Sequence, residues 1–427
     1  MSDAPPVDNA SPQIPKGALQ IIFLIVFMDL LGFGIIIPLL PLYATDYHAT
    51  VLQVGFLFAI FSACQFVASP ILGAISDRVG RRPVLVFSQL GSAVGYLLLG
   101  LVMSVHWGRP GYALLLIYLS RIIDGFSGGN VSTAQAYVSD VTTPQNRAKG
   151  MGVLGAAFGF GFAMGPALGA LLVLAHPALP GYFAAAMSLG AMVQTYLRLP
   201  ESRVHKPADS AGWLHPRRFA PLLRQSRLLQ LLLIAFFSMI TFAILQSIVA
   251  LFLNDRRTFG FKYWQVAAFY AYIGIVILIV QGGFISRLTK RLGEWRLATM
   301  GPILVAVGMS LLAWAGYEPR LIILLLGGAT NAVGRSLQTP TLYALISHNS
   351  DRRQQGVVFG MNQGLSGIAQ IIGPIFATLI FGVWICGPFL LATAIILMVA
   401  AWTMRLRRQS GQSAIVDMPA DPATESL

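Results

Sequence analysis

Charged residues are scarce in this chain. Asp, Glu, Lys and Arg make up 11% of its 427 residues, whereas hydrophobic residues make up 56% and the mean hydropathy is +0.70. Soluble domains devote about a quarter of their residues to these four charged types. Because lipid tolerates a charge at few positions, this content excludes a water-soluble domain and predicts an integral membrane protein.

Three further features that the sequence lacks exclude particular classes of function. The two cysteines, Cys64 and Cys386, lie within or at the edge of apolar runs, so neither a disulfide framework nor a metal site is predicted. The sequence contains no Gly-Lys dipeptide, which excludes a Walker A loop and ATP as the energy source. Its longest internal polar stretch, 200–227, is too short for a catalytic domain. We therefore predict a protein that is not an enzyme and needs no cofactor.

Long apolar runs fill most of the sequence. Runs of about 20 residues, the length of a membrane-crossing helix, predict an all-α integral membrane protein with twelve transmembrane helices. The polar segment 1–17 lacks a basic region before the first span, so we expect an N-terminal tail that is not cleaved. The polar residues 406–427 are expected to be a disordered C-terminal tail. The predicted spans are 18–43, 51–75, 84–105, 111–139, 146–175, 179–198, 228–253, 263–286, 297–316, 320–346, 354–382 and 385–404.

The net charge of +13 is unevenly distributed along the chain. Most of the 29 lysine and arginine residues lie in the even-numbered connections between spans and in the two tails. By the positive-inside rule both termini are cytoplasmic, which requires an even number of spans. Membrane topology therefore accounts for the positive charge, and no nucleic-acid partner is predicted.

The two halves of the chain show weak internal similarity. Gly165-Pro166 in the fifth span matches Gly373-Pro374 in the eleventh, and Tyr137 in the fourth matches Tyr343 in the tenth. These matches predict two pseudo-symmetric six-helix bundles, 18–198 and 228–405, joined by a cytoplasmic central loop over 199–227. Carriers built in this way move two halves around a central site.

Four motifs carry a family resemblance. They are Asp29-Leu-Leu-Gly-Phe-Gly34 in the first span, the turn from Gly73 to Pro83, Arg121-Ile-Ile-Asp-Gly125 in the fourth span, and the stretch from Gly155 to Gly169 in the fifth. With these motifs the chain resembles the twelve-helix drug/proton antiporters of the major facilitator superfamily, and within them the tetracycline-pump-like subgroup. The resemblance implies the major facilitator fold and proton-coupled export. It covers the first six spans well and the last six loosely.

Glycines in the fifth span recur at every fourth position. They lie on one helix face and let a neighbouring helix approach closely, while Pro166 is expected to bend the helix. Plain close packing is an equally good interpretation of the pattern. The resemblance implies an antiporter motif that seals the cytoplasmic side of the pathway. The residues of this packing motif are Gly155, Gly161, Gly165, Pro166 and Gly169.

The turn after the second span combines glycine with charge. Topogenic charge alone explains its arginines but neither its glycines nor its aspartate. The resemblance implies a cytoplasmic gating motif in which Asp77 and Arg81 latch the two halves and release during the conformational switch. The motif residues are Gly73, Asp77, Arg78, Gly80 and Arg81.

Four formally charged residues lie deep within spans. A charge at that depth costs about 2.5–3.5 kcal/mol on an insertion scale, so each residue must face a partner or water. Arg121 and Asp124 share a helix face, and an internal ion pair is as good an interpretation as a functional role. Asp29 has no opposite charge within one turn and is the sharper candidate for proton binding. The fourth residue is Arg335.

Histidine is excluded from proton coupling, because all six histidines lie in connections or near span ends. Tetracycline antiporters carry a histidine in their eighth helix, whereas 264–287 contains none. These pumps usually have a small apolar residue where this chain has Asp124. Both differences leave open whether tetracycline is a substrate. Uncharged polar residues within the spans are candidates for substrate binding or for helix–helix hydrogen bonds: Asn130, Gln135, Gln246, Gln338 and Asn362.

The sequence therefore predicts a monomeric secondary transporter in a cytoplasmic membrane, the bacterial inner membrane by resemblance, with a small molecule, protons and lipid as its partners. Proton-coupled efflux of a lipophilic or amphipathic compound by Asp29, Arg121 and Asp124 is the leading hypothesis. One alternative is a proton-coupled importer or exchanger of a polar metabolite. Another is a sensor or assembly factor that keeps the fold but transports nothing, because fold alone does not decide function.

Overall fold

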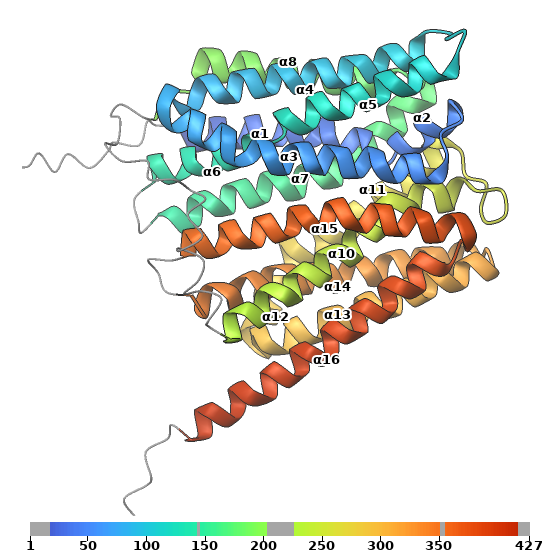
Figure 1. The fold of residues 1–427 in the computed structure, drawn as a ribbon. Helices are drawn as coiled ribbons and strands as arrows, with labels where there is room; N and C mark the ends of the chain where they lie inside the picture. The colour runs from blue at the N-terminus through green and yellow to red at the C-terminus, as the bar shows by residue number, and fades with distance from the viewer. Residues whose placement is uncertain (1–17, 143–145, 203–225, 351–354, 417–427) are drawn as a thin grey trace, which may run out of the picture. The chain divides into compact units, whose positions relative to one another are not determined.

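The computed structural model describes residues 18–142, 146–202, 226–350 and 355–416 (Figure 1). Within these ranges the regular elements are helices and no strand occurs. A helix satisfies its own backbone N–H and C=O groups, which is a requirement for crossing lipid. The prediction of an all-α membrane fold is thus confirmed. The predicted N-terminal tail, most of the central loop and the end of the C-terminal tail lie outside the described residues.

Residues 18–202 form eight of the described helices: α1 (Ala18–Ile36), α2 (Leu40–Asp46), α3 (Val51–Val79), α4 (Arg81–Ser104), α5 (Pro110–Ser127), α6 (Asn130–Val141), α7 (Arg147–Ala175) and α8 (Leu179–Arg198). Residues 226–416 form the others: α10 (Ser226–Asn254), α11 (Tyr263–Ile279), the π-helical η2 (Val280–Phe284), α12 (Ile285–Leu292), α13 (Glu294–Tyr317), α14 (Leu321–His348), α15 (Gln355–Val383) and α16 (Gly387–Val416).

Contacts divide the chain into two compact units. Unit 1 comprises Met1–Trp213 with Gly260–Gly274, and unit 2 comprises Leu214–Phe259 with Ile275–Leu427. The first part of α11 belongs to unit 1 because Gly274 packs on the backbone of Ala163 in α7. Sequence order, by contrast, places that segment in the second bundle.

Nine helical segments within the described ranges are long and apolar enough to cross a membrane. The other three predicted spans, 111–139, 146–175 and 179–198, are also helical and correspond to α5 with α6, to α7 and to α8. Of these, α7 contains the apolar segment Gly159–Ala175. Helices therefore occupy all twelve predicted spans.

The prediction of one continuous helix over 111–139 is wrong. Helix α5 ends at Ser127, and α6 begins at Asn130 after a turn at Gly128 and Gly129. Two adjacent glycines weaken a helix, and the side chain of Gln65 donates a hydrogen bond to the carbonyl oxygen of Gly128 over 2.9 Å. The break puts Asn130 at the start of a new helix.

Proline produces a second break, within the predicted span 18–43. Helix α1 ends at Ile36, and α2 begins at Leu40. Pro38 lies in the connection and has no backbone N–H to continue the helix, whereas Pro41 occupies the first turn of α2, where that N–H is not needed.

The C-terminal boundary also differs from the prediction. Helix α16 continues to Val416, so the predicted disordered tail 406–427 is helical over its first part. No proline lies between Pro388 in the first turn and Pro419, which allows the helix to run past the end of the apolar stretch.

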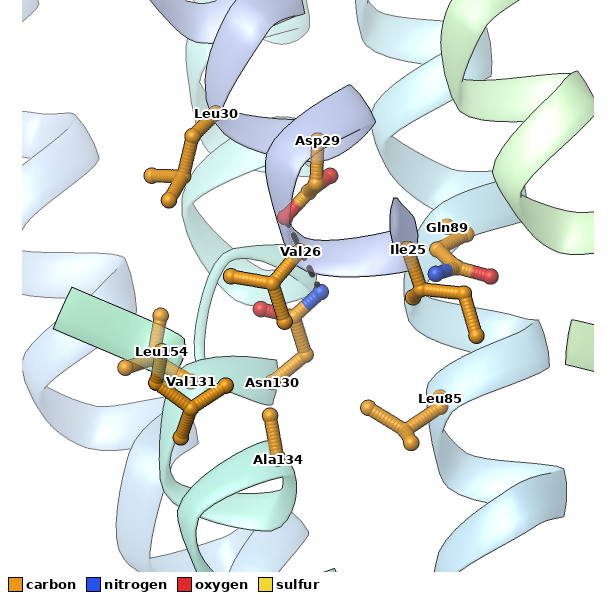
Figure 2. A pocket seen from close by; sticks show the side chains of 10 residues that line it. All are labelled: Ile25, Val26, Asp29, Leu30, Leu85, Gln89, Asn130, Val131, Ala134 and Leu154. Atoms are coloured by element: carbon orange, nitrogen blue, oxygen red, sulfur yellow. Dashed lines mark hydrogen bonds between the residues drawn. The ribbon is translucent and has the colours of Figure 1, made fainter. Parts of the chain in front are cut away.

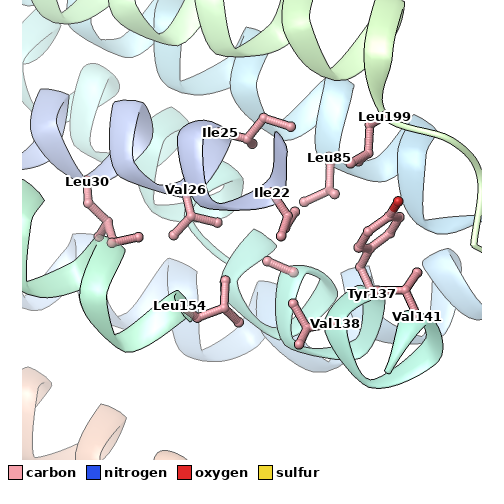
Figure 3. Close-up of a cluster of buried hydrophobic side chains, with 12 residues drawn as sticks. Ile22, Ile25, Val26, Leu30, Leu85, Tyr137, Val138, Val141, Leu154 and Leu199 are labelled. Atoms are coloured by element: carbon pink, nitrogen blue, oxygen red, sulfur yellow. The ribbon is translucent and has the colours of Figure 1, made fainter. Parts of the chain in front are cut away.

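A buried apolar cluster in unit 1 holds the first helix against its neighbours (Figure 3). It joins α1 to α4, α6 and α7, and the aromatic ring of Tyr137 lies fully buried within it. The cluster borders the polar cavity described next. It consists of Ile22, Ile25, Val26, Leu30, Leu85, Ala134, Tyr137, Val138, Val141, Leu154, Ala157 and Leu199.

Candidate functional site

A small cavity in unit 1 brings three polar side chains into the apolar core (Figure 2). Asp29 comes from α1, Gln89 from α4 and Asn130 from α6. The cavity has a volume of about 10 Å³, roughly the space that one water molecule needs. Apolar residues form the rest of its wall: Ile25, Val26, Leu30, Leu85, Val131, Ala134 and Leu154.

Asp29 is held in this cavity by an amide and not by a cation. Asn130 Nδ2 donates a hydrogen bond to Asp29 Oδ2 over 3.2 Å, drawn as a dashed line in Figure 2. No ion pair of Asp29 occurs among the residues that the structure describes. A carboxyl group in an apolar wall without a counterion is suited to binding and releasing a proton.

Gln89 was not among the residues singled out from the sequence. Its side chain is fully buried, and its Oε1 accepts a hydrogen bond from Thr195 Oγ1 over 2.8 Å. Its Nε2 has no hydrogen-bond partner among the described residues and points to the side where Asp29 lies (Figure 2). An unused donor and the carboxyl group of Asp29 thus belong to residues that line the same cavity. Ser88 and Ser92 lie in the same stretch of span 3, so the local sequence gave no signal that singled out Gln89.

Arg121 and Asp124 form a buried ion pair in α5, as one interpretation of their spacing predicted. Arg121 Nη1 lies 3.1 Å from Asp124 Oδ2, and the two side chains are 2% and 3% exposed. The guanidinium also lies 5.9 Å from the ring centroids of Phe61 and Tyr96. Because the arginine neutralises Asp124, the carboxyl group of Asp29 is the better candidate for carrying a proton.

The predicted substrate residues do not all meet in one place. Asn130 lines the cavity, whereas Gln135 lies on the exposed side of α6. Gln338 and Asn362 are buried in unit 2, and Gln246 is half-buried in α10. The structure therefore joins Asn130 to Asp29 and leaves the roles of the other four as predictions.

The glycines of the packing motif face α1. A Cβ added to Gly165 would lie 2.7 Å from Gly34 Cα, and one added to Gly161 would lie 2.7 Å from Leu30 Cβ. Gly169 faces the same helix, where a Cβ would lie 3.0 Å from a backbone oxygen. Helices α1 and α7 are thus in backbone contact, which places Asp29 on a helix held in a fixed position.

The remaining residues of this motif also belong to α7. Pro166 is buried inside the helix, and its Cδ would lie 3.5 Å from a Cβ added to Gly34. Gly155 lies nearer the start of the helix, and its surroundings are outside what the structure describes.

The gating motif forms a charge network inside unit 1. Arg81 Nη2 lies 2.7 Å from Asp77 Oδ1, and Arg81 Nε lies 3.1 Å from Asp140 Oδ2. Arg81 Nη1 also donates to Ser76 Oγ over 2.6 Å. The Arg81 side chain is 8% exposed, so this network fixes the ends of α3, α4 and α6. A latch between the two halves remains a prediction.

Gly80 gives the turn its shape. Its φ of 106° lies in a region that L side chains rarely adopt, so this position requires glycine. Directly after it, Glu201 accepts the backbone N–H groups of the first two residues of α4 over 2.9 and 3.1 Å. A carboxylate at a helix N-terminus is stabilising. Arg78 is exposed, and a Cβ added to Gly73 would meet only the hydroxyl of Ser132, at 3.9 Å.

Helices of membrane-spanning length and a part-buried carboxyl group in a cavity among them are features expected of a membrane transporter. The family model of the Major Facilitator Superfamily matches residues 22–374 and 284–423, and the chain belongs to this family.

Relatives of this chain include resistance proteins. It is 30% identical to multidrug resistance protein 1 of Bacillus subtilis (strain 168) over 393 residues, which cover 90% of this chain and 95% of the relative. It is 30% identical to tetracycline resistance protein, class C, of Escherichia coli, over 86% of this chain and 90% of the relative. The crystal structure of the human organic anion transporter MFSD10 matches with a TM-score of 0.67 and 26% identity, covering 91% of this chain and 99% of that one.

Proposed function

We propose that the protein exports a small lipophilic or amphipathic compound in exchange for protons, and that Asp29 is the group that binds the proton. The observation that carries this proposal is the carboxyl group of Asp29 in the wall of a cavity, hydrogen-bonded by Asn130 and without an ion pair among the described residues. Reversible protonation there changes the charge of a membrane-embedded site, which couples proton binding to a conformational change.

The relatives support the export of drugs. A multidrug resistance protein and a tetracycline resistance protein each align over most of this chain. The human structural relative is described as an organic anion transporter, so anionic amphipathic compounds belong among the candidate substrates. In this proposal both termini are cytoplasmic, and the two six-helix bundles alternate access to the substrate from either side.

Arg121, Asp124 and the charge network around Arg81 serve the conformational cycle in this proposal. The Arg121–Asp124 pair keeps α5 neutral within the membrane. The Arg81 network holds the cytoplasmic ends of three helices together and rearranges when the carrier switches. Two states of such a carrier differ by a few kcal/mol at most, since a larger difference traps one of them.

Substrate-induced proton movement tests the proposal. The purified protein is reconstituted into liposomes with a trapped pH-sensitive dye and challenged with lipophilic cations, tetracyclines, anionic amphipathic compounds and sugars. We expect at least one lipophilic or amphipathic compound to move protons with the parent protein and not with Asp29→Asn. Asp255→Asn is the matched control, because Asp255 lies outside the spans and pairs with Arg257 over 2.8 Å.

The other outcomes count against the proposal. Equal proton movement with the parent and Asp29→Asn assigns coupling to another residue. Proton movement with sugars alone favours an importer of polar metabolites. A cellular phenotype that persists in Asp29→Asn, together with no proton movement by the parent, favours a sensor.

A further inference from the structure

Arg335 is a cation near the middle of α14, and among the described residues it is held by neutral groups alone. Its Nη1 donates to the carbonyl oxygen of Ser238 over 3.3 Å, and its Nη2 donates to Thr241 Oγ1 over 2.9 Å. The guanidinium carbon lies 5.0 Å from the ring centroid of Phe242. All three contacts come from α10, and none carries a negative charge. The positive charge is therefore positioned but not neutralised.

The acidic residues described in unit 2 are engaged elsewhere. Asp255 pairs with Arg257, Glu294 lies 3.4 Å from a nitrogen of His348, and Glu318 pairs with Arg320. Each of these carboxylates lies at or just beyond a helix end. The described part of unit 2 thus supplies no carboxylate to the middle of α14.

A pair with the same three-residue spacing in unit 1 is neutralised. Helix α5 forms the first part of the fourth predicted span, and α14 forms the tenth. Each helix carries an arginine with a polar residue three positions later. In α5 that residue is Asp124, which pairs with Arg121 over 3.1 Å. In α14 it is Gln338, whose Nε2 donates to the hydroxyl of Ser238 over 2.7 Å. Because Gln338 carries no charge and α14 contains no aspartate or glutamate, this helix keeps a net positive charge.

The guanidinium of Arg335 also has donor capacity to spare. A guanidinium presents five N–H donors in a planar fork that matches a carboxylate or sulfonate. Its Nε is buried without a hydrogen-bond partner among the described residues, while the residue as a whole is partly exposed. Arg335 lies about 20 Å from either end of α14 at the helical rise of 1.5 Å per residue. Lipid headgroups gather near helix ends, so this depth favours an organic anion that enters the protein.

We propose that Arg335 binds the carboxylate or sulfonate of an anionic amphipathic compound, with Ser238 and Thr241 fixing the orientation of its guanidinium. This inference rests on the proposed function only in treating that compound as the cargo. The contrasting interpretation is that Arg335 merely ties α10 to α14. The two interpretations predict different effects of a carboxylate placed next to Arg335. If Arg335 binds an anion, the carboxylate removes the preference for anionic ligands, whereas a purely structural arginine leaves ligand preference unchanged.

Gln338→Glu is the discriminating variant. It places a carboxylate three residues after Arg335, as in α5. The Ser238 hydroxyl now donates to the carbonyl oxygen of Ile234 over 2.7 Å, and it can donate to the new carboxylate by turning away from that oxygen. Arg335→Gln removes the charge itself. Arg320→Gln is the matched control, because Arg320 lies just before α14 with a side chain that is 70% exposed.

The probe is naphthalene-1-acetate, compared with its neutral amide, and binding is measured by titration calorimetry in phosphatidylcholine nanodiscs. We expect the parent and Arg320→Gln to bind the anion about 10-fold or more tightly than the amide, as a charge-assisted hydrogen bond predicts. Gln338→Glu and Arg335→Gln should abolish that preference while still binding the amide. Equal binding of anion and amide by the parent, no binding of either, or a preference that survives in Gln338→Glu overturns the proposal.

Two further arms of the experiment separate anion binding at Arg335 from proton coupling and from lipid binding. Equilibrium binding needs no proton flux, so Asp29→Asn should keep the preference for the anion even if proton coupling fails. Anion binding at Arg335 is thereby tested independently of proton-coupled export. Displacement of the probe when phosphatidylglycerol replaces phosphatidylcholine would assign Arg335 to a lipid headgroup and overturn the proposal.

Discussion

The backbone contact between α1 and α7 predicts a sharp effect of one methyl group at Gly165. A Cβ at that position would lie 2.7 Å from both the Cα and the carbonyl carbon of Gly34, and 2.9 Å from the backbone nitrogen of Ile35. Ordinary van der Waals contact of a Cβ begins near 3.4 Å. Because the atoms in the way belong to the backbone, no flexible side chain can move aside. In Gly165→Ala the two helices must therefore separate by several tenths of an ångström.

The expected cost follows from two opposing effects. Overpacking a well-packed helix contact costs about 1–3 kcal/mol. Replacing glycine by alanine inside a helix stabilises the folded state by about 0.5–1 kcal/mol. Gly165→Ala should therefore lower the free energy of unfolding by about 1–2 kcal/mol. Asp29 lies on the displaced helix, so proton-coupled transport should fall more than stability alone explains.

Gly360→Ala is the matched control for this change. Gly360 lies within α15, and no heavy atom lies within 4 Å of the position that its Cβ would take. Thermal unfolding in detergent is measured for both variants. We expect Gly165→Ala to unfold a few degrees below the parent and Gly360→Ala at or above it. Equal unfolding temperatures for the two variants would refute the packing argument.

Further changes test other contacts. Asp124→Asn leaves the buried guanidinium of Arg121 without its counterion and should destabilise the protein by about 3–5 kcal/mol in denaturation experiments; a loss below about 1 kcal/mol contradicts the ion pair. Gly80→Ala places a side chain at a φ of 106° and should cost about 1–2 kcal/mol, so a neutral effect would disprove the strain. Desolvation raises the pKa of Asp46, and the hydrogen bond donated by Tyr263 lowers it in part. Because a raised pKa disfavours the carboxylate in the folded state, stability from this group is lost as pH rises through that pKa. Tyr263→Phe removes a donor to the carboxylate and should therefore destabilise the protein more at pH 8 than at pH 4, whereas an equal loss at both would exclude the coupling.

The sequence predicted those parts of the site that one helix contains. The spacing of Arg121 and Asp124 places both on one helix face, and the ion pair forms there. The i, i+4 spacing of the α7 glycines likewise defines a face, and that face meets α1. The apolar runs predicted the membrane-spanning helices, because their length and low charge are set by the bilayer.

Contacts between distant helices were harder to predict. The pairing of Asn130 with Asp29 depends on the break at Gly128 and Gly129, which a window of hydropathy does not register. Gln89 joins the cavity through the packing of α4, and nothing in its local sequence distinguishes it from other polar residues within spans. The observed site therefore differs from the predicted one for two reasons. A pair of glycines breaks a helix, and the packing of helices that are distant in sequence brings in Gln89.

The most direct test of the account compares two modes of transport by Asp29→Asn in the same proteoliposomes. A substrate that the parent exchanges for protons is followed first under a pH gradient and then as substrate–substrate exchange without one. Asparagine keeps the size of the side chain and removes its titration, so we predict that the variant retains exchange but loses accumulation driven by the gradient. Gradient-driven accumulation by Asp29→Asn at the level of the parent would contradict the assignment of proton coupling to Asp29.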